Sequence, residues 1–321
     1  MISRLNVVVI KPSKYELDGF VERFWRGFMP NSTIPFIRSM IPEKIGETQI
    51  HVETVDEYVH TDLSYMSLLD ADKYGPTLLL LVGVQSHQFH RALDIGAFAK
   101  KRNCMIAIGG PHPMTCDTSM LQGHGISFAQ AEAETVLSTI LADAVEGELQ
   151  PVYGADQRWA TELDPPVLIP PSKRDLSRCI VPMLGIYPYR GCPFTCNFCS
   201  VIKIAGRRVR GQAIDTTIAS LKAAKAAGVR MVMFTSDNFN KIPDVRELLT
   251  AMMEENVCLP FFCQCDTQIA GQPDLVALMA HAGCFDIFVG AESFNRATLL
   301  AAHKAQNHPE KYAEIVRHCR Q

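Results

Sequence analysis

The stretch Tyr187-Pro-Tyr-Arg-Gly-Cys-Pro-Phe-Thr-Cys-Asn-Phe-Cys-Ser200 places Cys192, Cys196 and Cys199 within eight residues, with the spacing C-x3-C-x2-C. Three thiolates so close along the chain can bind one face of a cubane [4Fe–4S] cluster and leave the fourth iron without a protein ligand. A small molecule with an amino and a carboxylate group can chelate that iron. The stretch follows a predicted strand at residues 184–189, and active sites of β/α barrels gather at the carboxyl ends of strands.

Zinc is the structural alternative for the same three thiols. A structural zinc site needs a fourth ligand, usually a nearby cysteine or histidine. The dozen residues after Cys199 contain neither, and the cluster interpretation is therefore favoured while zinc stays the alternative.

The rest of the C-terminal half alternates strands and helices around this loop. Strands are predicted at residues 184–189, 229–235, 259–265 and 285–290. Helices are predicted at 213–227, 245–255 and 273–282, and 296–321 is helical with a break near 307–309. The fold class is α/β, and residues 182–321 form a partial (β/α) barrel. Because it holds about four β/α units, we expect the barrel to be truncated.

The N-terminal half, residues 1–150, has the same kind of alternation. Strands are predicted at 5–10, 49–55, 77–84, 105–108 and 126–129, with helices at 90–102 and 132–145. Such a pattern predicts a parallel, doubly wound, flavodoxin-like sheet. The proline-rich residues 151–181 that follow are predicted to be a linker.

Composition and charge narrow the expected binding partners and the expected cellular compartment. The net charge of −3 gives no electrostatic case for binding nucleic acid. The longest aliphatic run, residues 78–82, is far shorter than the roughly 20 residues of a membrane span. Without a signal peptide pattern at the N-terminus, a cytoplasmic protein is expected. The chain has eleven cysteines, and most stand singly in apolar runs, which is typical of buried thiols rather than a disulfide framework.

From about Pro182 onward the chain resembles the radical SAM superfamily, through the cysteine triplet and the aromatic Phe198 before its last cysteine. The resemblance implies that Cys192, Cys196 and Cys199 ligate a [4Fe–4S] cluster and that Phe198 packs near the adenine of S-adenosylmethionine. It also implies reductive cleavage of S-adenosylmethionine to a 5′-deoxyadenosyl radical, with electrons from an external donor such as flavodoxin or ferredoxin. The cofactor carries the hard chemistry, and the protein positions and shields it.

Polar residues after the later strands are candidate S-adenosylmethionine contacts under this resemblance. Ser236 and Asp237 follow the second strand, where acceptors for the methionine ammonium are expected. Helix capping by the same residues is the competing explanation. Gln264 ends the third strand, and Glu292 and Ser293 follow the fourth, as candidate ribose or methionine contacts.

The N-terminal half resembles the cobalamin-binding domain that precedes many radical SAM barrels. The shared pattern is a strand ending near Ser86, a Gly109-Gly110-Pro-His-Pro turn, and an acidic helix start at residues 131–134. Ser86, Gly109 and Gly110 are therefore candidate cobalamin contacts. The D-x-H-x-x-G motif, whose histidine binds cobalt from below, is absent after the first strand, and His87 and His112 are expected to be loop residues.

Together, the two resemblances predict a cobalamin-dependent radical SAM methyltransferase that methylates an unactivated carbon. The expected substrate is a small molecule, such as a lipid or a secondary metabolite. A cyclase or rearrangement enzyme of the same fold is one alternative. A corrinoid or iron–sulfur binding protein without turnover is the other.

Overall fold

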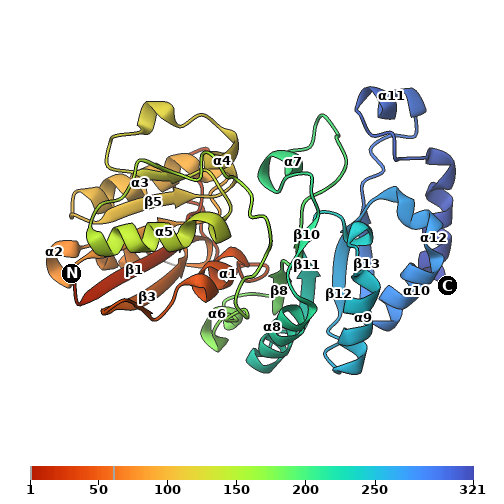
Figure 1. The fold of residues 1–321 in the computed structure, drawn as a ribbon, viewed down its shortest axis with the longest axis horizontal. Helices are drawn as coiled ribbons and strands as arrows, with labels where there is room; N and C mark the ends of the chain where they lie inside the picture. Colours follow the sequence, from red (N-terminus) through yellow and green to blue (C-terminus); the bar gives the residue numbers. More distant parts are fainter. Residues whose placement is uncertain (1, 61) are drawn as a thin grey trace. The chain divides into compact units, whose positions relative to one another are not determined.

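The computed structural model describes residues 2–60 and 62–321 of the chain, and these residues form two compact units (Figure 1). Unit 1 is Met1–Ala160 with Pro171–Val181, and unit 2 is Thr161–Pro170 with Pro182–Gln321. The segment predicted as a linker, residues 151–181, is divided between the two units. None of the helices in the described part of the chain combines the length and the apolar character that a bilayer crossing requires.

Unit 1 is built on a seven-stranded sheet with the order β2-β3-β1-β4-β5-β6-β7. Only β2 pairs antiparallel with its neighbour. From β3 to β6 the order is that of a flavodoxin-like, doubly wound sheet. The strands are β1 (Arg4–Lys11), β2 (Lys44–Ile45), β3 (Thr48–Asp56), β4 (Thr77–Leu81), β5 (Met105–Gly109), β6 (Ser127–Ala129) and β7 (Val152–Tyr153).

Both faces of this sheet are covered, which explains why its central strands are mostly apolar. Leu5, Val7 and Val9 of β1 pack on one face with helices α1 (Thr33–Met40) and α5 (Ala133–Glu146). Val8 and Ile10 pack on the other face with α3 (Phe89–Lys100). The remaining helices of unit 1 are α2 (Ala71–Tyr74), α4 (Pro111–Thr115) and α6 (Lys173–Ser177).

The strand predicted at residues 77–84 ends earlier, at Leu81. Gly83 has a φ of +60°, which turns the chain out of the extended conformation. The residues beyond it still bond to neighbouring strands, because Val84 donates its N–H to the carbonyl of Gly109 at 2.9 Å. The elements α1, β2 and β7 were not predicted; β2 and β7 have only two residues each, and α1 has eight.

Unit 2 is built on a four-stranded sheet with the order β13-β12-β11-β8. Every neighbouring pair is parallel, and each strand pairs with the next along the chain, as in a singly wound β/α series. The strands are β8 (Met183–Ile186), β11 (Met231–Phe234), β12 (Phe261–Cys265) and β13 (Cys284–Val289). The helices are α7 (Val201–Ile204), α8 (Ile214–Ala227), α9 (Val245–Glu254), α10 (Pro273–His281), α11 (Arg296–Ala301) and α12 (Tyr312–Arg320).

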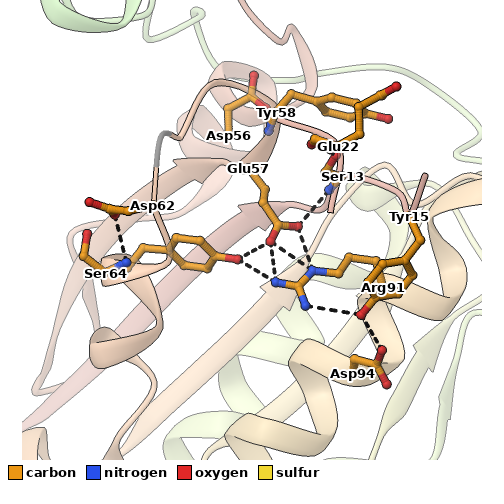
Figure 2. A network of polar contacts seen from close by, with 11 residues as sticks. Ser13, Tyr15, Glu22, Asp56, Glu57, Tyr58, Asp62, Ser64, Arg91 and Asp94 are labelled. Carbon is orange, nitrogen blue, oxygen red and sulfur yellow. Dashed lines mark hydrogen bonds and ion pairs between the residues drawn. The ribbon is translucent and has the colours of Figure 1, made fainter. Parts of the chain in front are cut away.

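A buried ion pair fixes the loops at the carboxyl edge of the unit 1 sheet (Figure 2). Glu57, directly after β3, is fully buried and lies 2.5 Å from the Arg91 guanidinium of α3. The other Glu57 oxygen accepts the backbone N–H of Ser13, after β1, at 2.9 Å. Tyr65 donates its hydroxyl to Glu57, and Arg91 also reaches the hydroxyl of Tyr15 at 3.4 Å. The network therefore joins the loops after β1 and β3 to α3.

Replacing Arg91 with Met is expected to lower the free energy of unfolding by about 3–5 kcal/mol, because the Glu57 carboxylate would stay buried without a counter-charge. The double variant Glu57→Leu/Arg91→Met is expected to recover part of that loss. Urea denaturation measures both. Lys44→Met, which breaks an exposed pair with Glu47, serves as the control and should change stability by less than about 1 kcal/mol. Equal losses in Arg91→Met and Lys44→Met would contradict the role given to this pair.

Candidate functional site

The cysteine loop leaves the sheet of unit 2 at the carboxyl end of β8 and is closed at its base by two short strands. These are β9 (Tyr189–Arg190) and β10 (Arg210–Gly211), which pair antiparallel. The chain between them, residues 191–209, contains all three predicted cluster ligands. Sequence periodicity did not reveal this pair, because each strand has only two residues.

Two glycines make the closed base possible. Gly191 has a φ of +97°, and a Cβ there would lie 2.2 Å from the carbonyl oxygen of Arg208. A Cβ on Gly211 would lie 2.1 Å from the ring of Tyr189. Arg210 is buried and donates to the carbonyl of Ala205 at 2.5 Å, so it stabilises the loop from within.

The three cysteines are free thiols on this loop. Cys196 is buried, whereas Cys192 and Cys199 are partly exposed. Burial raises the pKa of the Cys192 thiol, and N–H donors at Phe194 and Asn238 act in the opposite direction. Cys192 is held through its backbone N–H, which donates to the carbonyl of Gly206 at 3.1 Å.

No preformed single-ion metal site is found in residues 2–60 and 62–321, where no three His, Cys, Asp or Glu side chains stand together as ligands of one ion. A ready zinc site is therefore not found among them. A cubane cluster makes a different demand, since each cysteine binds a different iron. Three free thiols on one closed loop fit that donor set.

The polar candidates after β11 lie next to the cysteine loop. Asp237 accepts the backbone N–H of Gly191 at 2.9 Å, so its carboxylate ties the start of the loop to the end of β11. Ser236 is 1% exposed, and within the described residues its hydroxyl has no hydrogen-bond partner. A buried hydroxyl without a partner is costly, which makes Ser236 the stronger candidate for a ligand contact.

A buried amide–carboxylate network joins the end of β11 to the end of β12. Asn238 donates to Asp266 at 2.9 Å, and the Asp266 backbone N–H donates to the side chains of Asn238 and Asn240 at 3.0 and 2.9 Å. The amide of Asn238 also lies 4.0 Å from the sulfur of Cys192. The sequence had not singled out Asp266, although an acidic residue directly after an apolar strand was the available signal.

The candidates Phe198 and Glu292 are brought together by Lys304. The Lys304 ammonium is nearly buried, lies 2.7 Å from a Glu292 oxygen, and stands 5.6 Å from the ring centroid of Phe198. Glu292 has a φ of +61°, an uncommon conformation for a residue other than glycine. Of the two other candidates, Gln264 is half-buried on β12. The Ser293 hydroxyl accepts the backbone N–H of Asn295 at 3.0 Å, in the turn before α11.

The segment between α11 and α12 also contacts the cysteine loop, and the sequence did not predict this. The backbone N–H of Asn197 donates to the carbonyl of Ala302 at 3.2 Å, and its side chain donates to Ala301 at 3.3 Å. The side-chain amide of Gln306 lies 3.5 Å from the sulfur of Cys196. The helix predicted at 296–321 is thus interrupted over a longer stretch than the expected break near 307–309, since α11 ends at Ala301 and α12 begins at Tyr312. Residues 301–307 form a segment that contacts the cysteine loop.

In unit 1, the candidates Ser86, Gly109 and Gly110 lie in the loops after β4 and β5. The Ser86 hydroxyl is 3.1 Å from Nδ1 of His112, whose ring stacks on Phe89 at 3.8 Å between centroids. A Cβ on Gly110 would lie 2.2 Å from the backbone nitrogen of Val84. Gly110 is thus required by the close approach of the two loops themselves.

Gly109 differs from Gly110 in this respect. A Cβ on Gly109 would meet only the Cβ of Ala129, at an ordinary 3.4 Å. The fold of unit 1 does not demand glycine at this position. A ligand that approaches the backbone closely would explain it.

Comparison with known proteins agrees with the geometry of unit 2. Residues 186–321 match the Radical SAM superfamily. The chain therefore carries a radical SAM domain over these residues, and proteins of that superfamily use a [4Fe–4S] cluster and S-adenosylmethionine.

Particular relatives extend the similarity to both units. The chain is 28% identical over 292 residues to bacteriochlorophyllide d C-8(2)-methyltransferase of Chlorobaculum tepidum, covering 85% of this chain and 61% of that protein. It is 25% identical over 303 residues to hopanoid C-2 methylase of Rhodopseudomonas palustris, covering 90% of this chain and 54% of that protein. The chain thus spans less than two thirds of the length of either relative.

The fold resembles that of TsrM from Kitasatospora setae, a radical S-adenosylmethionine methyltransferase solved with cobalamin and a [4Fe–4S] cluster bound. The TM-score is 0.76 at 16% identity, over 99% of this chain and 67% of that one. At this identity the similarity concerns the fold alone.

Replacing Ser236 with Ala is expected to raise the free energy of unfolding of the ligand-free protein by about 1 kcal/mol, because it removes a buried hydroxyl without a partner. The neighbouring Thr235→Val is the control. The Thr235 hydroxyl donates to the carbonyl of Ile186 at 2.9 Å, and its loss should cost about 1 kcal/mol instead. Thermal and urea denaturation of the two variants measure the difference. A loss of stability in Ser236→Ala equal to that in Thr235→Val would contradict this account.

Proposed function

We propose that this chain binds a [4Fe–4S] cluster through Cys192, Cys196 and Cys199 and acts as a cobalamin-dependent radical SAM methyltransferase. The observation that carries the proposal is the closed loop of residues 191–209, which presents three free thiols at the carboxyl end of β8. With S-adenosylmethionine bound, the cluster would supply one-electron cleavage to methionine and a 5′-deoxyadenosyl radical.

The residues around the loop have separate parts in binding S-adenosylmethionine. The exposed ring of Phe198 offers a stacking surface for adenine. The unpartnered hydroxyl of Ser236 is an acceptor for the methionine ammonium. The carboxylate of Glu292, half-exposed and oriented by Lys304, is an acceptor for ribose hydroxyls, and Gln264 and Ser293 are further candidates. Asp237 holds the loop through Gly191 with one carboxylate oxygen and stays a candidate acceptor for the methionine ammonium.

We place the cobalamin site at the carboxyl edge of the unit 1 sheet. A doubly wound sheet binds its ligands at this edge, and no packing contact of the fold requires glycine at position 109 there. His112 is engaged with Ser86 and Phe89, and the D-x-H-x-x-G motif is absent from the loop after β1. Both observations support cobalamin bound without an imidazole ligand from this chain.

Methylation of an unactivated carbon in a small molecule is the reaction we propose. The two relatives are named as methyltransferases acting on a bacteriochlorophyllide and on a hopanoid, which supports a lipid or a secondary metabolite as substrate. Flavodoxin or ferredoxin would supply the electron, and the proposed setting is the cytoplasm. Because four parallel strands form the described sheet of unit 2, we further propose that the barrel of this chain is partial.

Replacing Cys196 with Ala is expected to abolish cluster binding and to lower 5′-deoxyadenosine formation at least tenfold, because one iron loses its protein ligand. Anaerobic reconstitution with iron and sulfide, followed by S-adenosylmethionine and a reductant, measures both. Cys258→Ala is the matched control, since this thiol lies outside the loop and contacts the carbonyl of Met252.

A wild-type protein that holds iron and cobalamin but forms no 5′-deoxyadenosine would instead indicate a binding protein without turnover. Cluster retention in Cys196→Ala would overturn the ligand assignment.

Replacing Gly109 with Ala is expected to weaken cobalamin binding at least tenfold while changing stability by less than about 1 kcal/mol. The added methyl group fits the ligand-free protein, so only an approaching ligand would be displaced. Equilibrium binding of hydroxocobalamin, followed by its absorbance, measures the change. Gly271→Ala, where a Cβ would meet no atom within 4 Å, is the control. Unchanged binding in Gly109→Ala would remove Gly109 from the proposed site.

A further inference from the structure

The amide of Gln306 is positioned on a sulfur of the proposed cluster ligands. Its Nε2 lies 3.5 Å from the sulfur of Cys196, within hydrogen-bond distance for an N–H donor and a sulfur acceptor. Cys196 is the most buried of the three thiols. A hydrogen bond to its sulfur is therefore poorly screened by water.

The 301–307 segment that carries Gln306 is anchored by other residues. Asn307 is fully buried and donates to the carbonyls of Gly290 and Ala291, each at 2.9 Å. Arg296 donates to the carbonyl of Ala305 at 2.9 Å. The bonds of Asn197 to the segment add a further attachment. Removing the Gln306 amide would thus leave the segment in place.

We propose that Gln306 is a positioning residue that raises the reduction potential of the [4Fe–4S] cluster through its hydrogen bond to Cys196. The inference rests on the proposed function, in which Cys196 binds the cluster. Reduction adds one electron and no bond is formed or broken, so negative charge on the cysteine sulfurs increases. An N–H donor stabilises the reduced form more than the oxidised form, and hydrogen bonds to the sulfurs are among the determinants of cluster potentials.

Lys304 is less suited than Gln306 to adjusting the reduction potential of the cluster. Its ammonium is also near the loop, but the carboxylate of Glu292 at 2.7 Å offsets its charge. The amide of Gln306 is neutral and directed at the sulfur itself. We therefore assign the adjustment of the potential to Gln306.

A redox titration of the reconstituted protein tests the proposal. The reduced cluster is followed by its electron paramagnetic resonance signal, with dithionite and low-potential mediators as the electron source. Gln306→Met keeps the length of the side chain and removes the donor. We expect it to disfavour reduction about tenfold, which is a shift of about 59 mV to more negative potential for one electron. Gln268→Met, at an exposed glutamine outside the loop, should match the wild type.

A second variant, together with the presence or absence of the cluster signal in each protein, distinguishes the possible outcomes. Gln306→Asn shortens the amide by one methylene group and should shift the potential in the same direction. A cluster signal in the wild type with equal potentials in Gln306→Met would overturn the inference while leaving the proposed function intact. Loss of the cluster from both variants would also overturn it, because Gln306 would then be needed to hold the loop. A wild-type protein that forms no cluster would contradict the proposed function itself.

Discussion

The hydrogen bond from the backbone N–H of Gly191 to the carboxylate of Asp237 is the constraint on which the arrangement of unit 2 depends. It joins the first residue of the cysteine loop to the end of the neighbouring strand. Gly191 adopts a left-handed conformation in which a Cβ would clash with the carbonyl oxygen of Arg208. Glycine at this position therefore allows the loop to leave β8 along the observed path. The antiparallel pair β9–β10 then closes the cysteine loop at its base. Three thiols are thereby held at one edge of the sheet by backbone geometry.

The same edge is tied together at each later strand by polar side chains. Asn238 and Asp266 connect the ends of β11 and β12. Thr267 donates to Asn307 at 3.0 Å, and Asn307 donates to the carbonyls that follow β13. Buried amides and carboxylates are stable only when they are paired, and these pairs are satisfied across strands. Among these paired groups of the described residues, the buried hydroxyl of Ser236 is an exception, because it has no hydrogen-bond partner.

Sequence periodicity and spacing predicted the features that are local. The apolar runs predicted the strands of both sheets within a few residues, except the two-residue strands β2 and β7, since strands buried on both faces are mostly apolar. The C-x3-C-x2-C spacing singled out the loop because its chemistry is concentrated in eight residues. The contact of Gln306 with Cys196 and the pair of Glu57 with Arg91 were not predictable. Their partners are 110 and 34 residues apart, and such pairings arise only from the fold.

At the carboxyl edge of the unit 1 sheet, too, the roles of residues depend on tertiary contacts that the local sequence pattern does not show. Lys11, at the end of β1, donates to the carbonyl of Gly83 and to Gln88 at 2.7 Å. Burial lowers the pKa of its ammonium to about 8, although the negative charge of Asp56 acts against this. The lysine fastens the loop after β4 to the end of β1, where the strand order reverses. Gly110 then packs against that fixed loop, whereas a Cβ on Gly109 beside it would meet only the Cβ of Ala129. Of two glycines that look alike in the sequence, the fold therefore requires Gly110, and packing does not require Gly109.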